Sequence, residues 1–260
     1  MERLVRSCYK KKSGYSFAKK AEDIAREYGI QRIARLASNE NPEPLSPLAL
    51  KAAEQALKTV NRYPDEKVNV LMQALRAHYP HERFVTGVGM DGVIETVIRT
   101  LVEPGEKVVI SAPTFSFYGL AAMGQGAEVA TVLREKDFSV DTKKLIREAK
   151  DAKVTVLCSP NNPTGNATPI DDVREILESI DGLLFLDNAY VEFADIDYIP
   201  LMKKHENLVL GRTMSKVYSL AGLRVGYAFT PRWLPPWYAR AGTPFTVDRK
   251  STRLNSSHRL

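Results

Sequence analysis

Short, almost entirely apolar segments alternate with amphipathic segments along most of the chain beyond residue 83. The apolar segments, which we predict to be strands, are residues 84–88, 107–111, 128–133, 154–158, 183–187, 208–212 and 225–229. Helical candidates lie between most of them, at residues 92–102, 118–123, 142–149 and 170–180. Strands that are apolar on both faces and are separated by helices form sheets buried on both sides. The pattern therefore predicts an α/β fold with a mostly parallel, seven-stranded sheet.

The first 80 residues predict three further helices with extended chain between them. Apolar residues at i, i+4 spacing and the stop at Gly29 indicate a helix over residues 17–28. Ser46 as N-cap and Pro47 as the first helical residue indicate another over residues 47–59, and residues 68–78 are helical again. The extended segments, at residues 36–42 and 62–65, are polar and rich in proline.

Composition places the chain among ordinary soluble globular proteins, with 260 residues, 44% of them apolar and 26% charged. No apolar run approaches the roughly 18 residues that a membrane helix needs, and no signal-peptide core follows the N-terminus. Cys8 and Cys158 lie far apart, and neither they nor the four histidines show metal-ligand spacing. We therefore expect a reduced, cytoplasmic setting, no metal site and no membrane partner.

The net charge of +6 suggests a nucleic-acid partner, but the last thirteen residues account for half of it. Residues 248–260 (DRKSTRLNSSHRL) carry four basic residues and one acid, and the apolar pattern stops before them. This segment also resembles the translation of a sequencing adaptor. Our hypothesis is that the reading frame of a truncated gene ran into adaptor sequence; a disordered basic tail is the alternative. We therefore predict no nucleic-acid partner.

Four short stretches at or beyond strand ends carry the chemistry. They are SPNNPTG from Ser159, DNAY from Asp187, TMSK from Thr213 and GLR from Gly222. In parallel sheets, ligands bind beyond the carboxyl ends of the strands. Together the stretches offer an amide, a carboxylate, a phenol, an amine and a guanidinium. That set suits pyridoxal 5′-phosphate (PLP), a phosphorylated aldehyde with a basic ring nitrogen that serves as an electron sink.

Each residue of this set has a chemical role and a structural alternative. The Lys216 amine would condense with the aldehyde, because nearby cations and partial burial favour its neutral, nucleophilic form; most lysines are simply exposed. Asp187 would hold the proton of the ring nitrogen, although aspartate often forms turns at such positions. Tyr190 and Asn162 would hydrogen-bond the ring hydroxyl, and Arg224 would bind the phosphate; the alternatives are a packed aromatic ring and a plain turn.

The sequence GVGMDG, from Gly87 to Gly92, follows a strand and opens a helix. A dinucleotide site would also need an acid at the end of the next strand, which instead continues as SAPTF. We favour a phosphate held by the backbone N–H groups of Met90, Asp91 and Gly92, with Asp91 at or near the N-cap. The alternative is that the glycines form a turn that binds no ligand. Phe115 could either stack on a ligand ring or pack in the core.

From about residue 30 to 247, the chain resembles the fold-type I PLP-dependent aminotransferases of the class I/II group. The motifs that carry the resemblance are LASNENP from Leu36, RYPD from Arg62, GMD from Gly89, APTF from Ala112, SPNNPTG from Ser159, DNAYVEF from Asp187, RTMSK from Arg212 and LAGLRVGY from Leu220. The lysine motif and SPNNPTG specify the superfamily. The resemblance implies a three-layer αβα large domain, a PLP cofactor and a homodimer with shared sites.

The resemblance also implies roles for individual residues. Lys216 would be the Schiff-base lysine, Asp187 the partner of the pyridine nitrogen, and Tyr190 and Asn162 the contacts of the ring hydroxyl. Thr213, Ser215, Arg224 and the backbone of Met90 and Asp91 would bind the cofactor phosphate. Phe115 would stack on the ring, Asn39 would lie near the substrate, and Tyr63 would reach the cofactor phosphate of the partner subunit.

Three departures from the family pattern stand out. Gly92 occupies a position that is often acidic, and Phe115 one that is usually tyrosine. The family's C-terminal small domain, with the arginine that binds the substrate carboxylate, would lie past residue 247. We therefore divide the chain into an N-terminal arm and substrate segment (1–46), an incomplete PLP-binding large domain (47–247) and a non-native tail (248–260).

The N-terminal motifs, LASNENP and RYPD, favour transfer of an amino group between L-histidinol phosphate and 2-oxoglutarate, a step of histidine biosynthesis. Three alternative functions are not excluded: an aminotransferase with an aromatic or other amino donor, a PLP-dependent decarboxylase of amino-acid phosphates, and a catalytically inactive PLP-binding fragment.

Overall fold

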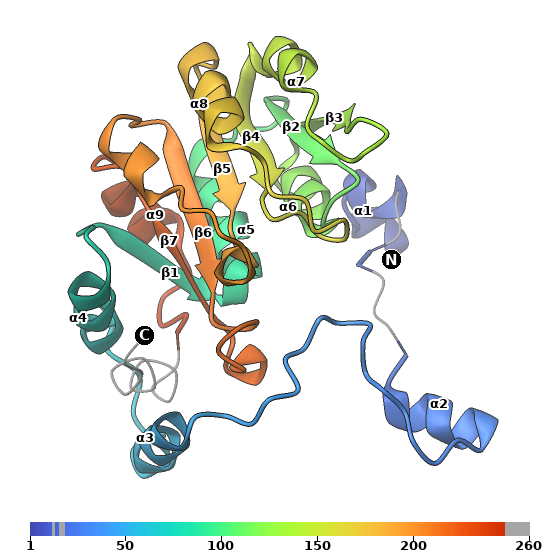
Figure 1. Ribbon diagram of the computed structural model, residues 1–260, viewed down its shortest axis with the longest axis vertical. Coiled ribbons are helices and arrows are strands. Elements are labelled where there is room, and N and C mark those ends of the chain that lie inside the picture. The colour runs from blue at the N-terminus through green and yellow to red at the C-terminus, as the bar shows by residue number, and fades with distance from the viewer. Residues whose placement is uncertain (12–13, 16–18, 248–260) are drawn as a thin grey trace.

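The computed structural model describes residues 1–11, 14–15 and 19–247. It contains a seven-stranded sheet in the order β1-β7-β6-β5-β4-β2-β3 (Figure 1). The strands are β1 (Phe84–Val88), β2 (Lys107–Ala112), β3 (Glu128–Leu133), β4 (Ala152–Cys158), β5 (Leu183–Asp187), β6 (Leu208–Thr213) and β7 (Val225–Phe229). Neighbouring strands are parallel except that β7 runs antiparallel to both β1 and β6. The predicted mostly parallel sheet is confirmed. The proposed tail, residues 248–260, lies outside the described residues.

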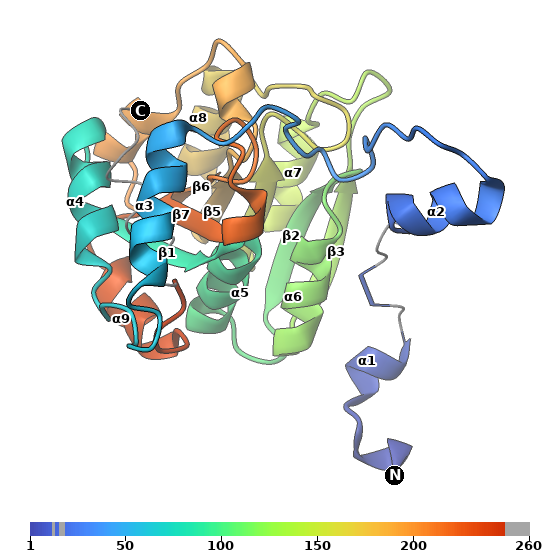
Figure 2. The ribbon, with the colours of Figure 1, turned by 90° about the horizontal axis from the view of Figure 1, so that it is seen from below.

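Helices cover both faces of the sheet and give a three-layer arrangement. Figures 1 and 2 show α5, α6 and α9 on one face, α7 and α8 on the other, and α3 and α4 beside β1. These helices are α3 (Pro47–Leu57), α4 (Asn69–His78), α5 (Gly89–Leu101), α6 (Phe117–Gln125), α7 (Thr142–Ala149), α8 (Ile170–Ser179) and α9 (Leu234–Ala241). Two short helices, α1 (Ser7–Lys11) and α2 (Ala21–Tyr28), precede them. Within the described residues, no helix has the length and apolar character of a bilayer span.

Several predicted helix boundaries were wrong. The described part of the helix predicted over 17–28 is helical only from Ala21, and α3 ends at Leu57 instead of residue 59. Helix α5 begins at Gly89, three residues earlier than predicted, so Asp91 lies in its first turn and Val88 is the N-cap. Glycine permits this early start, because Gly89 has φ +67°. Helix α9 was not predicted; its apolar residues Leu234 and Tyr238 pack against the α5 side of the sheet.

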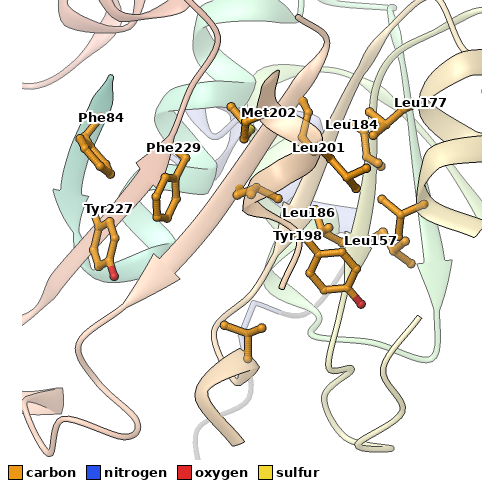
Figure 3. Packing of buried hydrophobic residues seen from close by; sticks show 14 of the residues in the cluster. Phe84, Leu157, Leu177, Leu184, Leu186, Tyr198, Leu201, Met202, Tyr227 and Phe229 are labelled. Atoms are coloured by element: carbon orange, nitrogen blue, oxygen red, sulfur yellow. The ribbon is translucent and has the colours of Figure 1, made fainter. Parts of the chain in front are cut away.

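Alternating strand residues divide the core into two buried layers. On one face, Val93, Val97 and Tyr118 pack on Ile110 and Phe185. On the other, helices α4, α7 and α8 pack on a second set of strand residues. Figure 3 shows part of this second layer, in which aromatic rings from β1 and β7 lie at one end and leucines from β4, β5 and α8 at the other. Burial on both faces explains why the inner strands β4, β5 and β6 are largely apolar, whereas the edge strand β3 is only partly buried.

The carboxyl ends of β4, β5 and β6 meet in register at one edge of the sheet. Cys158 pairs with Asp187 across β4 and β5, and Asp187 pairs with Gly211 across β5 and β6. The chain that precedes α3 approaches this same edge, since the Asn41 side chain donates to the carbonyl of Val217, 3.1 Å away, in the loop after β6. The sheet therefore positions residues from its centre and from the N-terminal segment around one point.

Candidate active site

A cavity of about 670 Å³ opens at this edge of the sheet, between the strand ends and the first turn of α5. Most site residues that the sequence predicts line it, whereas Tyr63 and Gly92 do not: Asn39, Met90, Asp91, Phe115, Asn162, Asp187, Tyr190, Thr213, Ser215, Lys216 and Arg224. The rule that ligands bind beyond the carboxyl ends of parallel strands explains why residues so far apart in sequence converge here.

Asp187 ends β5 as a buried carboxylate with only 2% of its surface exposed. Its Oδ2 accepts a hydrogen bond from the Tyr118 hydroxyl at 2.6 Å, and its Oδ1 accepts one from the backbone N–H of Ala189 at 2.9 Å. Among the described residues, no lysine or arginine forms an ion pair with it. Burial raises the pKa of Asp187 to about 6, because the charged form has lost its water without gaining a bound cation.

Lys216 lies in the loop after β6, with its amine in the cavity. Its Nζ donates to the carbonyl oxygens of Ser38 and Asn39, at 3.1 and 3.2 Å, and lies 5.5 Å from the centre of the Tyr190 ring. Burial lowers the pKa of Lys216, and the positive charge of Arg224 acts in the same direction, while Glu40 opposes both. The amine is therefore closer to its neutral, nucleophilic form than an exposed lysine.

The first turn of α5 and the start of β7 form one end of the cavity. The Arg224 Nη2 donates to Asp91 Oδ2 at 2.9 Å, and the Gly89 N–H donates to the Arg224 carbonyl at 2.7 Å. A Cβ at Gly89 would lie 2.4 Å from Arg224 Nη2, and one at Gly226 would lie 2.2 Å from the Gly89 carbonyl oxygen. The backbone contact requires glycine at position 226, and the φ of +67° favours glycine at position 89. Arg224 therefore lies with its guanidinium at the N-terminus of α5.

Two buried hydroxyls complete this end of the cavity. Thr213 Oγ1 donates to Ser215 Oγ at 3.0 Å and accepts the Ser215 N–H at 3.2 Å. Helix N–H groups, hydroxyls and a guanidinium are the groups that bind phosphate in proteins. This end of the cavity therefore has the donor set of a phosphate site.

The remaining predicted residues form the walls of the cavity. Phe115 lies just after β2, and its ring makes an edge-on contact with the Tyr118 ring at 5.5 Å. Asn39 Nδ2 donates to the Tyr190 hydroxyl at 3.1 Å, so the N-terminal segment contacts the loop after β5 directly. Asn162 is half-buried and shares this wall with Tyr190.

Tyr63 lies outside the cavity. It is 77% exposed, in the connection between α3 and α4, and its ring stacks on Phe245 at 4.7 Å. A single chain therefore does not bring Tyr63 to the other predicted site residues.

The comparisons with known proteins agree with this geometry. The family described as "Aminotransferase class I and II" matches residues 31–257. A histidinol-phosphate aminotransferase from Methanoculleus marisnigri is 65% identical over 96% of this chain and 71% of that protein. The chain belongs to the class I and II aminotransferase family.

A second sequence relative and a solved structure are also described as histidinol-phosphate aminotransferases. The histidinol-phosphate aminotransferase of Methanocorpusculum labreanum is 59% identical over 92% of the chain and 68% of that protein. The crystal structure of histidinol-phosphate aminotransferase from Sinorhizobium meliloti, in complex with pyridoxal-5′-phosphate, superposes with a TM-score of 0.85 at 27% identity. That alignment covers 98% of this chain and 70% of the other. The αβα fold-type I architecture predicted from the motifs is thereby confirmed.

Several residues that line the cavity of this aminotransferase were not predicted as site residues, among them Tyr118, Cys158 and Tyr15. Tyr118, buried in the first turn of α6, was predicted only as part of a helix, and Cys158 was given no role. Tyr15, from the N-terminal arm, makes an edge contact with Phe115 at 5.9 Å. The signal available for Tyr118 was its position three residues after Phe115, because a helix that starts at a strand end directs its first turn toward the ligand edge.

Proposed function

We propose that this chain is a PLP-dependent aminotransferase that transfers the amino group of L-histidinol phosphate to 2-oxoglutarate. The products would be imidazole-acetol phosphate and L-glutamate. The observation that carries the cofactor assignment is the buried, cation-free carboxylate of Asp187 in the same cavity as the Lys216 amine. The choice of L-histidinol phosphate as amino donor is supported by two relatives, 65% and 59% identical, that are described as histidinol-phosphate aminotransferases. A cytoplasmic location stays a prediction.

The donor set fits PLP at both ends of the cavity. Asp187 lacks a cation, and a protonated ring nitrogen would supply one at the place where burial now disfavours the charge. At the other end, we assign the phosphate to Arg224, the hydroxyls of Thr213 and Ser215, and the backbone N–H groups of Met90 and Asp91. When bound, PLP supplies an electron sink for the carbanion that forms at the α-carbon of the amino donor.

The chain's own residues would then move the proton. Lys216 Nζ, freed by the incoming substrate amine, would accept the proton from the α-carbon of the amino donor. It would then deliver this proton to the former aldehyde carbon of the cofactor, which is bonded to the substrate nitrogen. Its lowered pKa supports this role, because a general base must be neutral near the operating pH. Asp187 would keep the ring-nitrogen proton in place, so that negative charge developing on the α-carbon is stabilised.

Side chains on the walls would orient the ring and the substrate. We assign the ring hydroxyl to Asn162 and Tyr190, and one face of the ring to Phe115. Asn39, which already contacts Tyr190, would lie beside the substrate. These groups would hold the reacting carbon close to Lys216 Nζ and in the right orientation, which lowers the entropic part of the activation barrier for proton transfer.

A panel of amino donors tests the proposed reaction. We expect kcat/KM for L-histidinol phosphate to exceed that for unphosphorylated L-histidinol by about 100-fold, because two charge-assisted hydrogen bonds to a phosphate contribute about 3 kcal/mol. Glutamate formation is measured for each donor, with aromatic amino acids and amino-acid phosphates included and carbon dioxide monitored. A preferred aromatic donor, carbon dioxide release, or bound PLP without turnover would each contradict the proposal in a different way.

We further propose a homodimer in which Tyr63 completes the site of the partner subunit. Tyr63 is exposed, and α3 beside it presents the exposed apolar side chains of Leu48, Leu50 and Leu57. Leu50 and Leu57, seven residues apart, lie on one face of α3, and exposed apolar side chains grouped in this way are typical of an interface between subunits. The exposure of Tyr63 on a single chain is what a residue that acts across such an interface requires.

Subunit mixing tests this shared site. We expect Tyr63→Ala and Lys216→Ala each to be nearly inactive, and an equimolar mixture, unfolded and refolded together, to regain about a quarter of the wild-type activity. Half of the dimers in such a mixture are hybrids, and each hybrid has one site that holds both Lys216 and the partner's Tyr63. Activity no greater than the sum of the two separate variants would contradict the shared site.

A further inference from the structure

The hydroxyl of Tyr118 makes a short hydrogen bond to the carboxylate at the centre of the site. It donates to Asp187 Oδ2 at 2.6 Å, and neither side chain is more than 2% exposed. The other carboxylate oxygen accepts the Ala189 N–H. One oxygen of Asp187 is therefore held by its own loop, and the other by a helix that lies 69 residues away in the sequence.

The Tyr118 side chain is held in place by the buried packing around it. Tyr118 lies in the first turn of α6 with no exposed surface, and it belongs to the buried layer that contains Ala122 and Ile110. The edge-on contact with Phe115, at 5.5 Å and 86°, fixes its ring from the cavity side. Burial and the negative charge of Asp187 raise the pKa of Tyr118 well above its ordinary value, so the hydroxyl keeps its proton and donates it.

Other groups that face Asp187 do not replace this bond. The titratable and charged groups around it are Tyr118 from α6, Cys158 from β4, Asp91 from α5, Lys216 from the loop after β6 and Tyr190 from the loop after β5. Asp91 disfavours the charge on Asp187, whereas the Lys216 ammonium favours it but donates to Ser38 and Asn39. The Cys158 thiol interacts with the same Tyr118 hydroxyl and donates to the Pro160 carbonyl.

We propose that Tyr118 is a positioning residue that acts through Asp187, holding this carboxylate ionised and fixing the direction in which its free lone pairs meet a cation. The identity of that cation as the ring nitrogen of PLP rests on the proposed function. Tyr118 itself donates to no ligand in this arrangement, because its single proton is committed to Asp187 Oδ2. Tyr118 lies outside the motifs that carry the family resemblance, and the packing of α6 on β2, β3 and α5 places its hydroxyl at the end of β5.

The first test measures the coupling in the protein without cofactor. Tyr118→Phe keeps the ring and removes the donor, so the pKa of Asp187 should rise above about 6 in the folded state. At pH 4.5 Asp187 is protonated in both folded proteins, and at pH 8 it is ionised in both. In the variant, the ionised carboxylate lacks the hydrogen bond from the Tyr118 hydroxyl. The unfolding constant of the variant divided by that of the wild type, from urea titrations, should therefore grow by about tenfold between pH 4.5 and pH 8.

Tyr238→Phe is the matched control. Tyr238 is also a buried tyrosine of the same layer, but its hydroxyl donates to the neutral carbonyl of Thr86 at 3.0 Å. Its removal should lower stability by the same factor at every pH. A Tyr118→Phe difference that is equally independent of pH would show a merely structural role and would overturn the proposal.

The second test measures PLP affinity, from the absorbance of the bound cofactor, between pH 5.5 and 8.5. We expect Tyr118→Phe to weaken PLP binding by about tenfold at pH 7.5 and to move the acid limb of the affinity profile upward by roughly one pH unit. Unchanged affinity and an unchanged profile would overturn the proposal. If the wild type bound no PLP, the proposed function would fail, and the urea titrations alone would decide whether Tyr118 controls the ionisation of Asp187.

Discussion

Lys216→Ala is expected to abolish the covalent attachment of PLP and to lower kcat by about four orders of magnitude. Lys216 is the amine that lines the cavity beside Asp187, and its pKa is already lowered by burial. In the proposed mechanism, removing it takes away both the attachment point and the base that moves the α-proton. The measurement is the mass of the protein after borohydride reduction in the presence of PLP, together with single-turnover rates.

Lys143→Ala provides the control for this experiment. Lys143 is exposed on α7, away from the cavity, and its loss should leave both the reduced adduct and the rate unchanged. A pyridoxyl adduct that persists in Lys216→Ala, on a different lysine, would mean that the reactive amine has been assigned to the wrong residue.

Asp187→Asn is expected to stabilise the protein without cofactor while lowering kcat/KM by two to three orders of magnitude. The pKa of Asp187 is about 6 in the folded protein and 3.8 as its ordinary value. Above pH 6 the side chain is ionised in both states, and burying that charge costs about 3 kcal/mol. Below pH 3.8 it is protonated in both states, and the cost vanishes. The wild type therefore loses stability as the pH rises through this window, and the variant does not.

The measurement is the free energy of unfolding of both proteins at pH 4 and pH 8, in the absence of PLP. The advantage of Asp187→Asn should grow by about 2 kcal/mol over this range, because the unfolded chain is already partly ionised at pH 4. Asp181→Asn, which replaces an exposed carboxylate just before β5, should show no such growth. A constant difference between wild type and Asp187→Asn would mean that the carboxylate gains enough solvation in the folded protein to keep its ordinary pKa.

The sequence by itself determined the strands and the residues at their carboxyl ends. Strands buried on both faces must be apolar over their whole length, so the pattern located all seven. Asp187 ends β5, Asn162 lies in the loop after β4 and Lys216 in the loop after β6, and parallel strands bring such positions to one edge. Local sequence was therefore sufficient to place these three residues in one cavity, and the motifs around them were sufficient to indicate the family.

Only the tertiary structure decided which distant groups act on those residues. Arg224 precedes its strand, and it reaches the same edge as the other residues because β7 runs antiparallel to β6. The Tyr118 hydroxyl meets Asp187 because α6 packs on β2, β3 and α5 with its first turn beside the strand ends. The Ser38 carbonyl meets Lys216 because the N-terminal segment approaches the same strand ends. Strand direction, layer packing and chain crossings depend on contacts summed over the whole domain, so no local window of sequence encodes them.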